Sequence, residues 1–267
     1  MIIAEFCQNH CGDWEILKEM IHSSRRAGAW GGKIQTFFAD DLSDGFTNQY
    51  IRMKRAELSW ELHQKFVSEC KSVGMVPITT IYKVGYLPKL IEAGFRWIKI
   101  GSPQAMNKEL ICITAATGVS VIMSTGGWEL EKLPRITPLA CVMHCVSDYP
   151  THPYKANLSR LIRIKRLWNS AIGFSSHIDP LHPKWFEVLG MAMYLGAQYT
   201  EVHYTILPRD KTQDGPVSIT EDQLAKLSDF EKLDHGEKLD QFPHWGMILP
   251  IAPEFDPRIA HYSLRFK

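Results

Sequence analysis

The sequence predicts a (β/α)8 barrel made of one domain. Eight short apolar runs of strand length follow one another along the chain, and helical patterns separate most of them. Such alternation is typical of a parallel sheet covered by helices, and eight repeats are the number that closes into a barrel. An open doubly wound sheet is the alternative, but no Gly-x-Gly-x-x-Gly turn follows the first strand.

The predicted strands are apolar runs bounded by polar residues or turns. In chain order they are Ile2–Glu5, Lys33–Phe37, Val76–Thr80, Trp97–Ile100, Val119–Met123, Ala140–His144, Ile172–Phe174 and Tyr199–His203. We expect them to form a barrel domain within residues 1–235, with 236–267 as a C-terminal tail.

Helix signals lie between these strands. Asp13 can cap a helix that Gly28 ends, and Ser59 can cap another. Pro183 suits the first turn of a later helix that closes at Gly196. These helices carry apolar residues at helical spacing, which predicts that one face of each packs on the sheet.

Three stretches depart from the alternation. Asp40 to Ala56 is a long polar and aromatic insertion, which we expect to be a loop that covers the substrate. Between Gly126 and Pro138 there is little room for a full helix, so we expect a stunted one. The segment from Phe242 to Lys267 holds too many prolines for a helix.

The composition argues against several classes of protein. The net charge is +1, and the sequence shows no basic stripe of the kind that a nucleic-acid binder normally carries. Apolar residues make up 45% of the chain, which allows a substantial core. The chain has no uninterrupted apolar stretch of about 18 residues that would span a membrane, and its first residues lack the features of a secretory peptide. We therefore expect a cytoplasmic protein whose six cysteines are reduced and mostly buried as small apolar residues.

Two histidines come at the ends of successive strands. His177 follows the seventh predicted strand and His203 ends the eighth, and the carboxyl ends of barrel strands meet at one rim. With Glu5 at the end of the first strand they offer a mixed nitrogen and oxygen site for manganese, magnesium, iron or zinc. His10 and His144 are further imidazoles expected near the same rim.

Two lysines stand inside apolar strand patterns. Lys33 and Lys99 would bury ammonium groups, and a buried cation needs a partner. An anionic ligand would satisfy both, and hydroxyls suited to phosphate gather at the strand ends. These hydroxyls belong to Thr80, Ser102, Ser124 and Ser175. The pattern predicts an anion pocket beside a cation.

Six groups of short motifs follow one another from Ile2 to about Leu227. They are Ile3-Ala4-Glu5 with Gln8-Asn9-His10 and Gly12-Asp13, Lys33-x-Gln35-Thr36-Phe37, Ser124-Thr125-Gly126, His144-Cys145-Val146-Ser147 with Tyr149-Pro150-Thr151, Gly173-Phe174-Ser175-x-His177, and Glu201-x-His203-Tyr204-Thr205. In this order the motifs resemble those of the sialic acid synthase (N-acetylneuraminate synthase) family.

The resemblance implies an enzyme that condenses phosphoenolpyruvate with the open-chain aldehyde of an amino sugar, giving a 2-keto-3-deoxy acid and phosphate. It also implies a homodimer and a divalent metal, Mn²⁺ or Mg²⁺, held by His177 and His203. Phosphoenolpyruvate would contact Lys33, Thr80, Lys99, Ser102, Ser124 and Ser175, while Gln35 and Tyr149 would face the sugar. The expected catalytic residues are Lys33, Lys99, Gln104 and Tyr149.

Several positions depart from the family pattern. Gln104 stands near where the family carries a carboxylate that handles protons, and an amide cannot titrate. Ser147 keeps a hydrogen-bond donor in place of an asparagine, but Asp148 would repel phosphate unless a lysine or a proton neutralises it. Cys11 replaces an asparagine, and Asp214 is our candidate for a family aspartate that binds substrate after the last strand.

Two interpretations therefore stay open. The first is an active synthase with a non-standard aldehyde acceptor. The second is a barrel that binds phosphoenolpyruvate without catalysis, because Gln104 has replaced the carboxylate and the chain stops at Lys267, about where an antifreeze-like domain of the family would begin. A synthase of the ketodeoxyoctulosonate type shares the chemistry but fits Gln8-Asn9-His10 poorly.

Overall fold

Eight parallel strands close into a barrel in the computed structural model, which describes residues 1–42, 47–136 and 139–241. Each strand pairs with the next one along the chain, and the first pairs with the last. The strands are β1 (Ile2–Cys7), β2 (Gly31–Thr36), β3 (Val76–Ile81), β4 (Trp97–Ile100), β5 (Ser120–Ser124), β6 (Cys141–Cys145), β7 (Ala171–Ser176) and β8 (Tyr199–His203). The predicted barrel is confirmed, and the open sheet is excluded.

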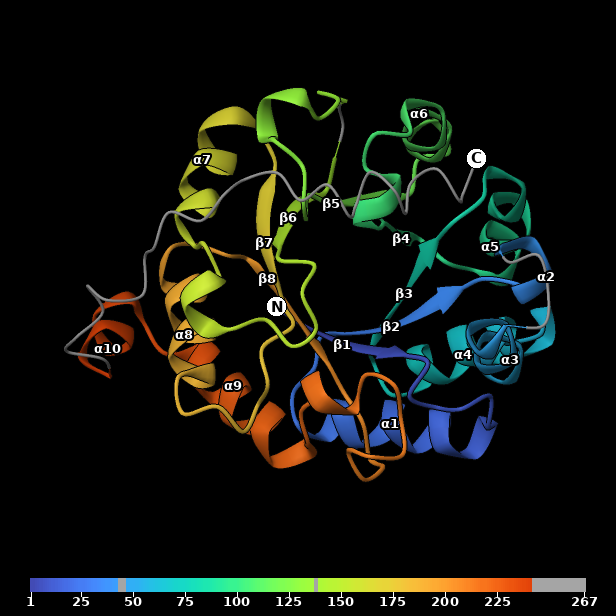
Figure 1. The fold of residues 1–267 in the computed structure, drawn as a ribbon, viewed down its shortest axis with the longest axis horizontal. Coiled ribbons are helices and arrows are strands. Elements are labelled where there is room, and N and C mark those ends of the chain that lie inside the picture. The colour runs from blue at the N-terminus through green and yellow to red at the C-terminus, as the bar shows by residue number, and fades with distance from the viewer. Residues whose placement is uncertain (43–46, 137–138, 242–267) are drawn as a thin grey trace.

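Helices surround the barrel (Figure 1). They are α1 (Trp14–Arg26), α4 (Trp60–Ser72), α5 (Leu87–Ala93), α6 (Lys108–Ala116), α7 (Ser159–Leu167), α8 (Trp185–Tyr194), α9 (Glu221–Lys232) and α10 (His235–Asp240). Short 3-10 turns are η1 (Val84–Tyr86), η2 (Ser102–Gln104), η3 (Leu130–Lys132), η4 (Pro153–Lys155) and η5 (Gly215–Val217). Of the described residues between β5 and β6, only η3 is helical, which agrees with the expected stunted helix.

The ends of the helices follow the predicted capping chemistry in most places. The Asp13 carboxylate accepts hydrogen bonds from the first turn of α1, and the Ser59 hydroxyl accepts one from the first turn of α4. Gly28 follows α1 with φ at 98°, a conformation that favours glycine. Pro183 differs from expectation: it lies two residues before α8, because Lys184 holds the N-cap position.

The predicted covering loop at 40–56 is wrong as a loop, since most of this insertion is helical. It contains α2 (Ala39–Leu42) and α3 (Asn48–Ala56), with residues 43–46 outside the described part. Thr47 caps α3, and Asp40 contacts both Tyr50 and Lys54, so side-chain contacts favour the helix over a loop. At the other end of the chain, the prediction for residues 242–267 lies outside the described residues.

The inside of the barrel has two layers, because every second side chain of a strand points inward. The layer nearer the strand starts is apolar and consists of Ile3, Ile78, Ile122, Cys141, Met143 and Tyr199, with Trp30 and Trp97 against it. The layer nearer the strand ends is polar. A larger apolar core fills the space between strands and helices.

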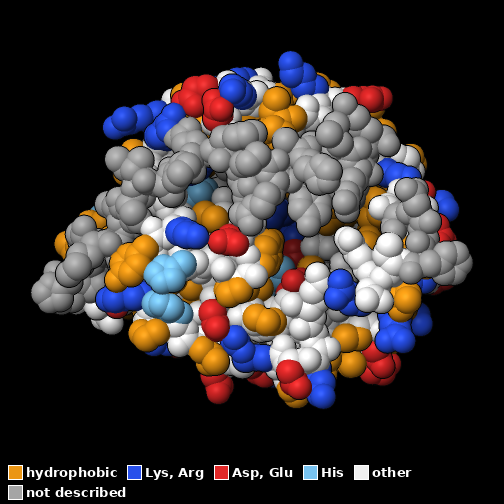
Figure 2. All heavy atoms as spheres, in the orientation of Figure 1, with side chains coloured by type: hydrophobic (Ala, Val, Ile, Leu, Met, Phe, Trp, Pro, Cys, Tyr) orange, Lys and Arg blue, Asp and Glu red, His pale blue; other side chains and the backbone are white. Residues whose placement is uncertain are grey.

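The polar layer faces solvent through one open end. In the space-filling view of the face seen in Figure 1, acidic and histidine side chains show inside a hollow near the middle (Figure 2). None of the helices that the structure describes combines the length and the hydrophobicity that crossing a membrane requires.

Candidate active site

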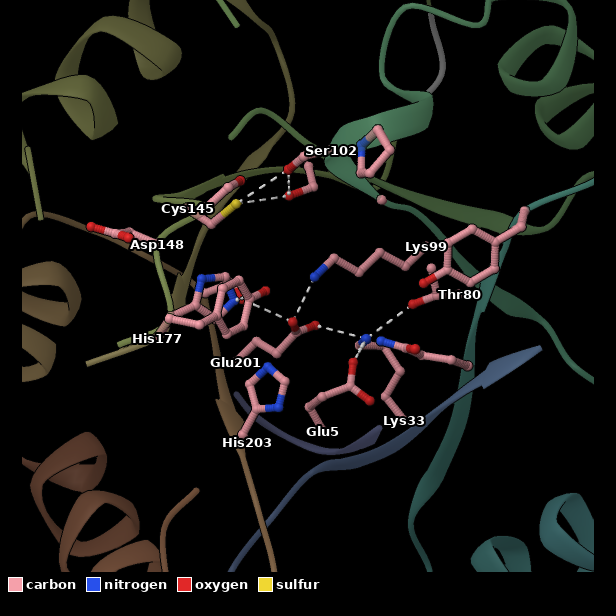
Figure 3. Close-up of a pocket in the computed structure, with 18 residues that line it drawn as sticks. Glu5, Lys33, Thr80, Lys99, Ser102, Cys145, Asp148, His177, Glu201 and His203 are labelled. Carbon is pink, nitrogen blue, oxygen red and sulfur yellow. Dashed lines mark hydrogen bonds and ion pairs between the residues drawn. The ribbon is translucent and has the colours of Figure 1, made fainter. Parts of the chain in front are cut away.

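A cavity of about 480 Å³ opens at the carboxyl ends of the strands (Figure 3). Every strand or the residues just after it contributes to the wall, as is usual for active sites of this fold. Twelve predicted site residues line it: Glu5, Lys33, Gln35, Thr80, Lys99, Ser102, Ser124, Ser147, Tyr149, Ser175, His177 and His203. Asp148, which was expected to repel phosphate, also lines the cavity. The lining is completed by five residues to which the sequence analysis assigned no role: Tyr82, Gly101, Pro103, Cys145 and Glu201.

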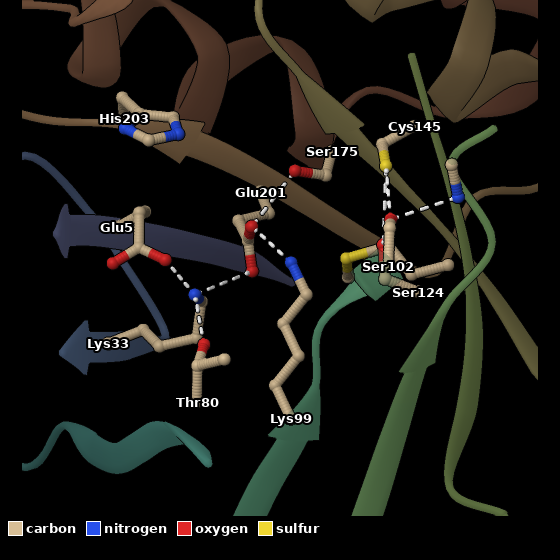
Figure 4. A network of polar contacts seen from close by, with 12 residues as sticks. Glu5, Lys33, Thr80, Lys99, Ser102, Ser124, Cys145, Ser175, Glu201 and His203 are labelled. Carbon is tan, nitrogen blue, oxygen red and sulfur yellow. Dashed lines mark hydrogen bonds and ion pairs between the residues drawn. The ribbon is translucent and has the colours of Figure 1, made fainter. Parts of the chain in front are cut away.

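A buried ionic network forms the floor of the cavity (Figure 4). Lys33 pairs with Glu5, donates to the Thr80 hydroxyl at 3.0 Å and lies 3.6 Å from Glu201. Lys99 donates to the other oxygen of Glu201 at 2.5 Å. The partners that the two buried lysines were expected to need thus include two glutamates of the chain, which the sequence analysis had not paired with them.

Burial and the neighbouring charges shift the protonation of this network. Burial lowers the pKa of Lys33 to about 7, and nearby Lys99 adds to the decrease while Glu201 opposes it. Burial alone would raise the pKa of Glu201, but the ammonium groups of Lys33 and Lys99 outweigh it and hold that pKa below its usual range. Glu201 is therefore an anion whose two oxygens face Lys99 and Lys33.

Glu201 is one of the cavity residues that the sequence reasoning missed. It was part of a quoted motif, but it received no role. Its position two residues before His203 in β8 was the available signal, because a spacing of two puts both side chains inside the barrel. The Ser175 hydroxyl donates to the same carboxylate at 2.9 Å.

Opposite the lysines, hydroxyl and thiol groups form a small cradle. The Ser102 hydroxyl lies 3.0 Å from that of Ser124 and 3.3 Å from the Cys145 sulfur, and it accepts from the backbone N–H of Gly126 at 3.0 Å. A Cβ at Gly126 would come within 2.6 Å of the Ser147 hydroxyl oxygen, so only glycine leaves this space open. Donors that converge in this way suit an anionic oxygen.

The two predicted metal histidines are both buried but have different partners. The Nε2 of His177 lies 2.8 Å from the Tyr149 hydroxyl, and its Nδ1 lies 2.5 Å from the Val146 carbonyl oxygen. Burial, with His203 nearby, lowers the pKa of His177 to about 3, and burial also lowers the pKa of His203. Both rings are therefore neutral near pH 7, which is the form that binds metals.

The fit to a metal ion is best at His203. Its Nδ1 is buried and has no hydrogen-bond partner, so a ligand for this atom would relieve an unsatisfied group. The centroids of the His177 and His203 rings are 5.4 Å apart, but Tyr149 would have to release His177 before its Nε2 could bind an ion. The third predicted ligand, Glu5, is occupied by Lys33 and by the backbone N–H of Cys7.

Four residues considered from the sequence lie in other surroundings. Gln104 is buried, but its oxygen accepts from Asn107 and it does not line the cavity, where Pro103 lies instead. Asp214 also lies outside the lining, 3.6 Å from His203 Nδ1. His10 and His144 are buried away from the cavity wall.

Asp148, the possible source of repulsion, does line the cavity. Its carboxylate lies 3.8 Å from the Lys155 ammonium group. Both side chains are at least one-third exposed, at 35% and 66%. Solvent and a lysine thus moderate the charge that was expected to oppose phosphate.

Comparison with known proteins gives consistent matches. The N,N'-diacetyllegionaminic acid synthase of Legionella pneumophila is 27% identical over 253 residues, which cover 85% of this chain and 67% of that protein. The uncharacterized protein MJ1065 of Methanocaldococcus jannaschii is 31% identical over 226 residues, covering 80% of this chain and 64% of that protein. The chain thus spans about two-thirds of the length of these curated relatives.

A solved structure and a family model agree with these relatives. The N-acetylneuraminic acid (sialic acid) synthetase of Leptospira borgpetersenii, solved in complex with citrate, superimposes with a TM-score of 0.80 at 27% identity, covering 100% of this chain and 92% of that one. Residues 20–234 match the model of the NeuB family, which is well over half of the chain. This chain therefore belongs to the NeuB family.

Proposed function

We propose that this protein condenses phosphoenolpyruvate with the aldehyde carbon of an open-chain amino sugar, yielding a 2-keto-3-deoxy acid and inorganic phosphate. The observation that carries the proposal is the two-sided cavity. Lys33 and Lys99 lie on one side, the hydroxyl cradle around Ser102 and Gly126 lies on the other, and His203 is at the rim. A small ligand with two anionic groups fits this arrangement.

The two sides of the cavity would divide the charges of phosphoenolpyruvate between them. One anionic group would lie against the side chains of Lys33 and Lys99, and the other would accept hydrogen bonds from the hydroxyls of Ser102 and Ser124. Glu201 keeps both ammonium groups in position before the substrate arrives, because its two oxygens face different lysines. A prearranged site of this kind stabilises charge as it develops.

The reaction joins C3 of the enol to the aldehyde carbon, after which water adds at C2 and phosphate leaves with its bridging oxygen. A divalent cation at His203 would polarise the aldehyde carbonyl, with manganese the first ion to test. Tyr149 and His177, hydrogen-bonded at 2.8 Å on the rim, are the candidate donors of the proton that the former aldehyde oxygen takes up. Holding both reactants in attack geometry contributes up to about 7–11 kcal/mol.

The acceptor side of the cavity lies toward the rim, where Gln35, Asp148 and Tyr149 line it. Amide, carboxylate and phenol groups bind sugar hydroxyls and acetamido groups well. Relatives are named as synthases of legionaminic, pseudaminic and N-acetylneuraminic acids, which supports an amino-sugar aldehyde as the acceptor class.

One observation favours the second candidate, a barrel that binds phosphoenolpyruvate without turning it over. After β4 the cavity is lined by Pro103, while Gln104 faces Asn107. No titratable group thus comes from the two residues after Ser102. Catalysis then depends on the pair Tyr149 and His177, and the alternative holds if that pair cannot supply the proton.

The test is phosphate release from phosphoenolpyruvate with Mn²⁺ and a panel of aldehyde sugars that includes N-acetylmannosamine and its 6-phosphate. We expect release with at least one acceptor, loss on chelation, and a decrease of about 100-fold or more in Lys33→Ala. The matched control is Lys132→Ala, whose side chain is 65% exposed and pairs with Glu129. If no acceptor gives phosphate release while calorimetry still detects phosphoenolpyruvate binding, the result would favour the barrel that binds without catalysis.

A further inference from the structure

Three potential metal ligands from distant parts of the chain converge beside the cavity, and one of them, His203, lines it. Cys7 ends β1, His203 ends β8, and Asp214 precedes η5. Each offers one ligand atom, and these atoms all lie within 4.8 Å of one another. Within residues 1–42, 47–136 and 139–241, no other group of three or more His, Cys, Asp or Glu residues meets this spacing.

The His203 ring points to a missing ligand. Its side chain is only 5% exposed, and its Nδ1 has no hydrogen-bond partner, with the Asp214 carboxylate at 3.6 Å. In Figure 4 no contact of the ionic network reaches this ring, although Glu5 and Glu201 lie close to it. A buried ring nitrogen without a partner is unusual, and coordination of a cation would satisfy it.

Cys7 is placed beside this nitrogen by an uncommon backbone conformation. Its φ is 46°, in the left-handed region that residues with a side chain disfavour, and its backbone N–H donates to Glu5 at 2.7 Å. Its thiol is buried near Asp214. Cys11 has nearly the same φ, 53°, but its side chain is exposed and stands outside the cluster.

We propose that Cys7, His203 and Asp214 form a binding site for a zinc-type divalent cation, with the Cys7 thiolate as a ligand. This deepens the proposed function, because it names the ligands of the cation at His203 in place of His177 and Glu5. Both of these residues are occupied, by Tyr149 and by Lys33 respectively.

The donor set decides which ions the site prefers. A thiolate, an imidazole and a carboxylate with one open position are a ligand set of the catalytic zinc type. Thiolate shifts the preference away from Mg²⁺ and Mn²⁺, which favour oxygen ligands, toward Zn²⁺ and Co²⁺. Bonds of about 2.0–2.3 Å require the three ligand atoms to draw together by about 1 Å, and the thiol proton leaves to solvent as the sulfur–metal bond forms.

The test uses Co²⁺ alone with the full chain, because a thiolate bound to Co²⁺ gives a charge-transfer band in the near ultraviolet. We expect this band at one equivalent of Co²⁺, its removal by Zn²⁺, and its loss in Cys7→Gly. The affinity for Co²⁺ should fall by about 100-fold or more in this variant, because even groups that only orient a ligand contribute about 10–100-fold. Cys7→Gly suits the positive φ, so the variant should fold.

The chain offers a matched control at Cys11. Cys11→Gly makes the same substitution at nearly the same φ, and the band and the affinity should both persist. Co²⁺ binding that gives no charge-transfer band in the unaltered chain, or equal affinity in Cys7→Gly, overturns the proposal. Loss of binding in His177→Ala with no change in Cys7→Gly would place the ion on the two histidines instead.

Binding and turnover fail independently in these measurements. If phosphate release depends on Mn²⁺ but Co²⁺ gives no charge-transfer band, the proposed synthase activity is supported and the proposed thiolate site is rejected. A charge-transfer band in a chain that releases no phosphate from phosphoenolpyruvate with any acceptor would support the thiolate site and argue against the synthase.

Discussion

The two ends of the barrel interior use the same strands for opposite chemistry. At one end the rings of Trp30, Trp97 and Tyr199 pack with centroids 5.1–5.6 Å apart. Two residues further along β4 and β8, Lys99 and Glu201 form an ion pair of 2.5 Å. Along β4 and β8, one inward-facing residue thus belongs to the apolar layer and the next inward-facing residue belongs to the polar layer of the cavity.

This difference explains how the site can contain so many buried charges. Removing charged groups from water is costly, and the ionic layer must be held in good geometry for its attractions to offset that cost. The apolar layer with its packed aromatic rings holds in position the strands that carry the charged side chains. Changes at one end should therefore affect stability, and changes at the other should affect binding and turnover.

The most severe test of this division is Glu201→Gln. It should lower phosphate release by about 100–1000-fold, because both lysines lose the anion that positions them. The melting temperature should fall as well, since Lys99 stays buried without its partner. Glu129→Gln, which removes a surface pair with Lys132, is the control. A loss below about tenfold would mean that the network is structural only.

The apolar layer is tested by Ile122→Ala in β5. Ile122 is fully buried, so the free energy of unfolding should decrease by about 2–5 kcal/mol in urea titrations. The KM for phosphoenolpyruvate should stay nearly constant, because the side chain does not line the cavity. A large rise in KM without a loss of stability would contradict the separation of the two layers.

Ser124→Ala, two residues later in the same strand, should give the opposite result. Loss of one hydrogen bond to an anionic group should weaken phosphoenolpyruvate binding by about 1.5–3 kcal/mol, measured by calorimetry. The free energy of unfolding should change by less than about 1 kcal/mol. Ser120→Ala, at the start of β5 and outside the cavity lining, controls for the hydroxyl itself.

We expect the barrel wall between the strands and α7 to lose stability in acid. His144 is buried there with its Nε2 2.7 Å from the Ala156 carbonyl oxygen, and burial, followed by Arg160, lowers its pKa to about 3. The unfolded chain binds this proton near pH 6.5, so stability is lost as the pH falls from about 6.5 toward 3.

Urea titrations at several pH values measure this effect. From about pH 6.5 to pH 5 His144 should remove up to about 2 kcal/mol, and His144→Gln should flatten the slope. An unchanged slope in the variant would assign the acid sensitivity to another group, such as the buried His10 with its pKa of about 4.

The sequence was sufficient for the strands and for most of the cavity wall. Runs such as Trp97–Ile100 carry the pattern of a buried parallel strand, and in a barrel all such runs deliver their last residues to one rim. Lys33, Ser175 and His203 were therefore found without knowledge of their neighbours.

Pairings across strands were less accessible to sequence reasoning. That Glu5 lies opposite both Lys33 and His203 follows from the register of β1 with β2 and β8, which no local pattern encodes. Without it, the lysines were assigned an external anion, and Cys7 was treated as a small apolar residue. Gln104 was misjudged for a similar reason, because η2 directs Pro103 to the cavity instead.

The pairing of two lysines with two glutamates has a kinetic consequence. The charges on the cavity floor cancel, so the floor projects little electrostatic field into solution. We expect the association rate constant of an anionic substrate to depend only weakly on ionic strength, because steering over long distances needs an unbalanced charge. Capture would then rest on short-range contacts made after entry, and discrimination among anions would appear in their dissociation rates.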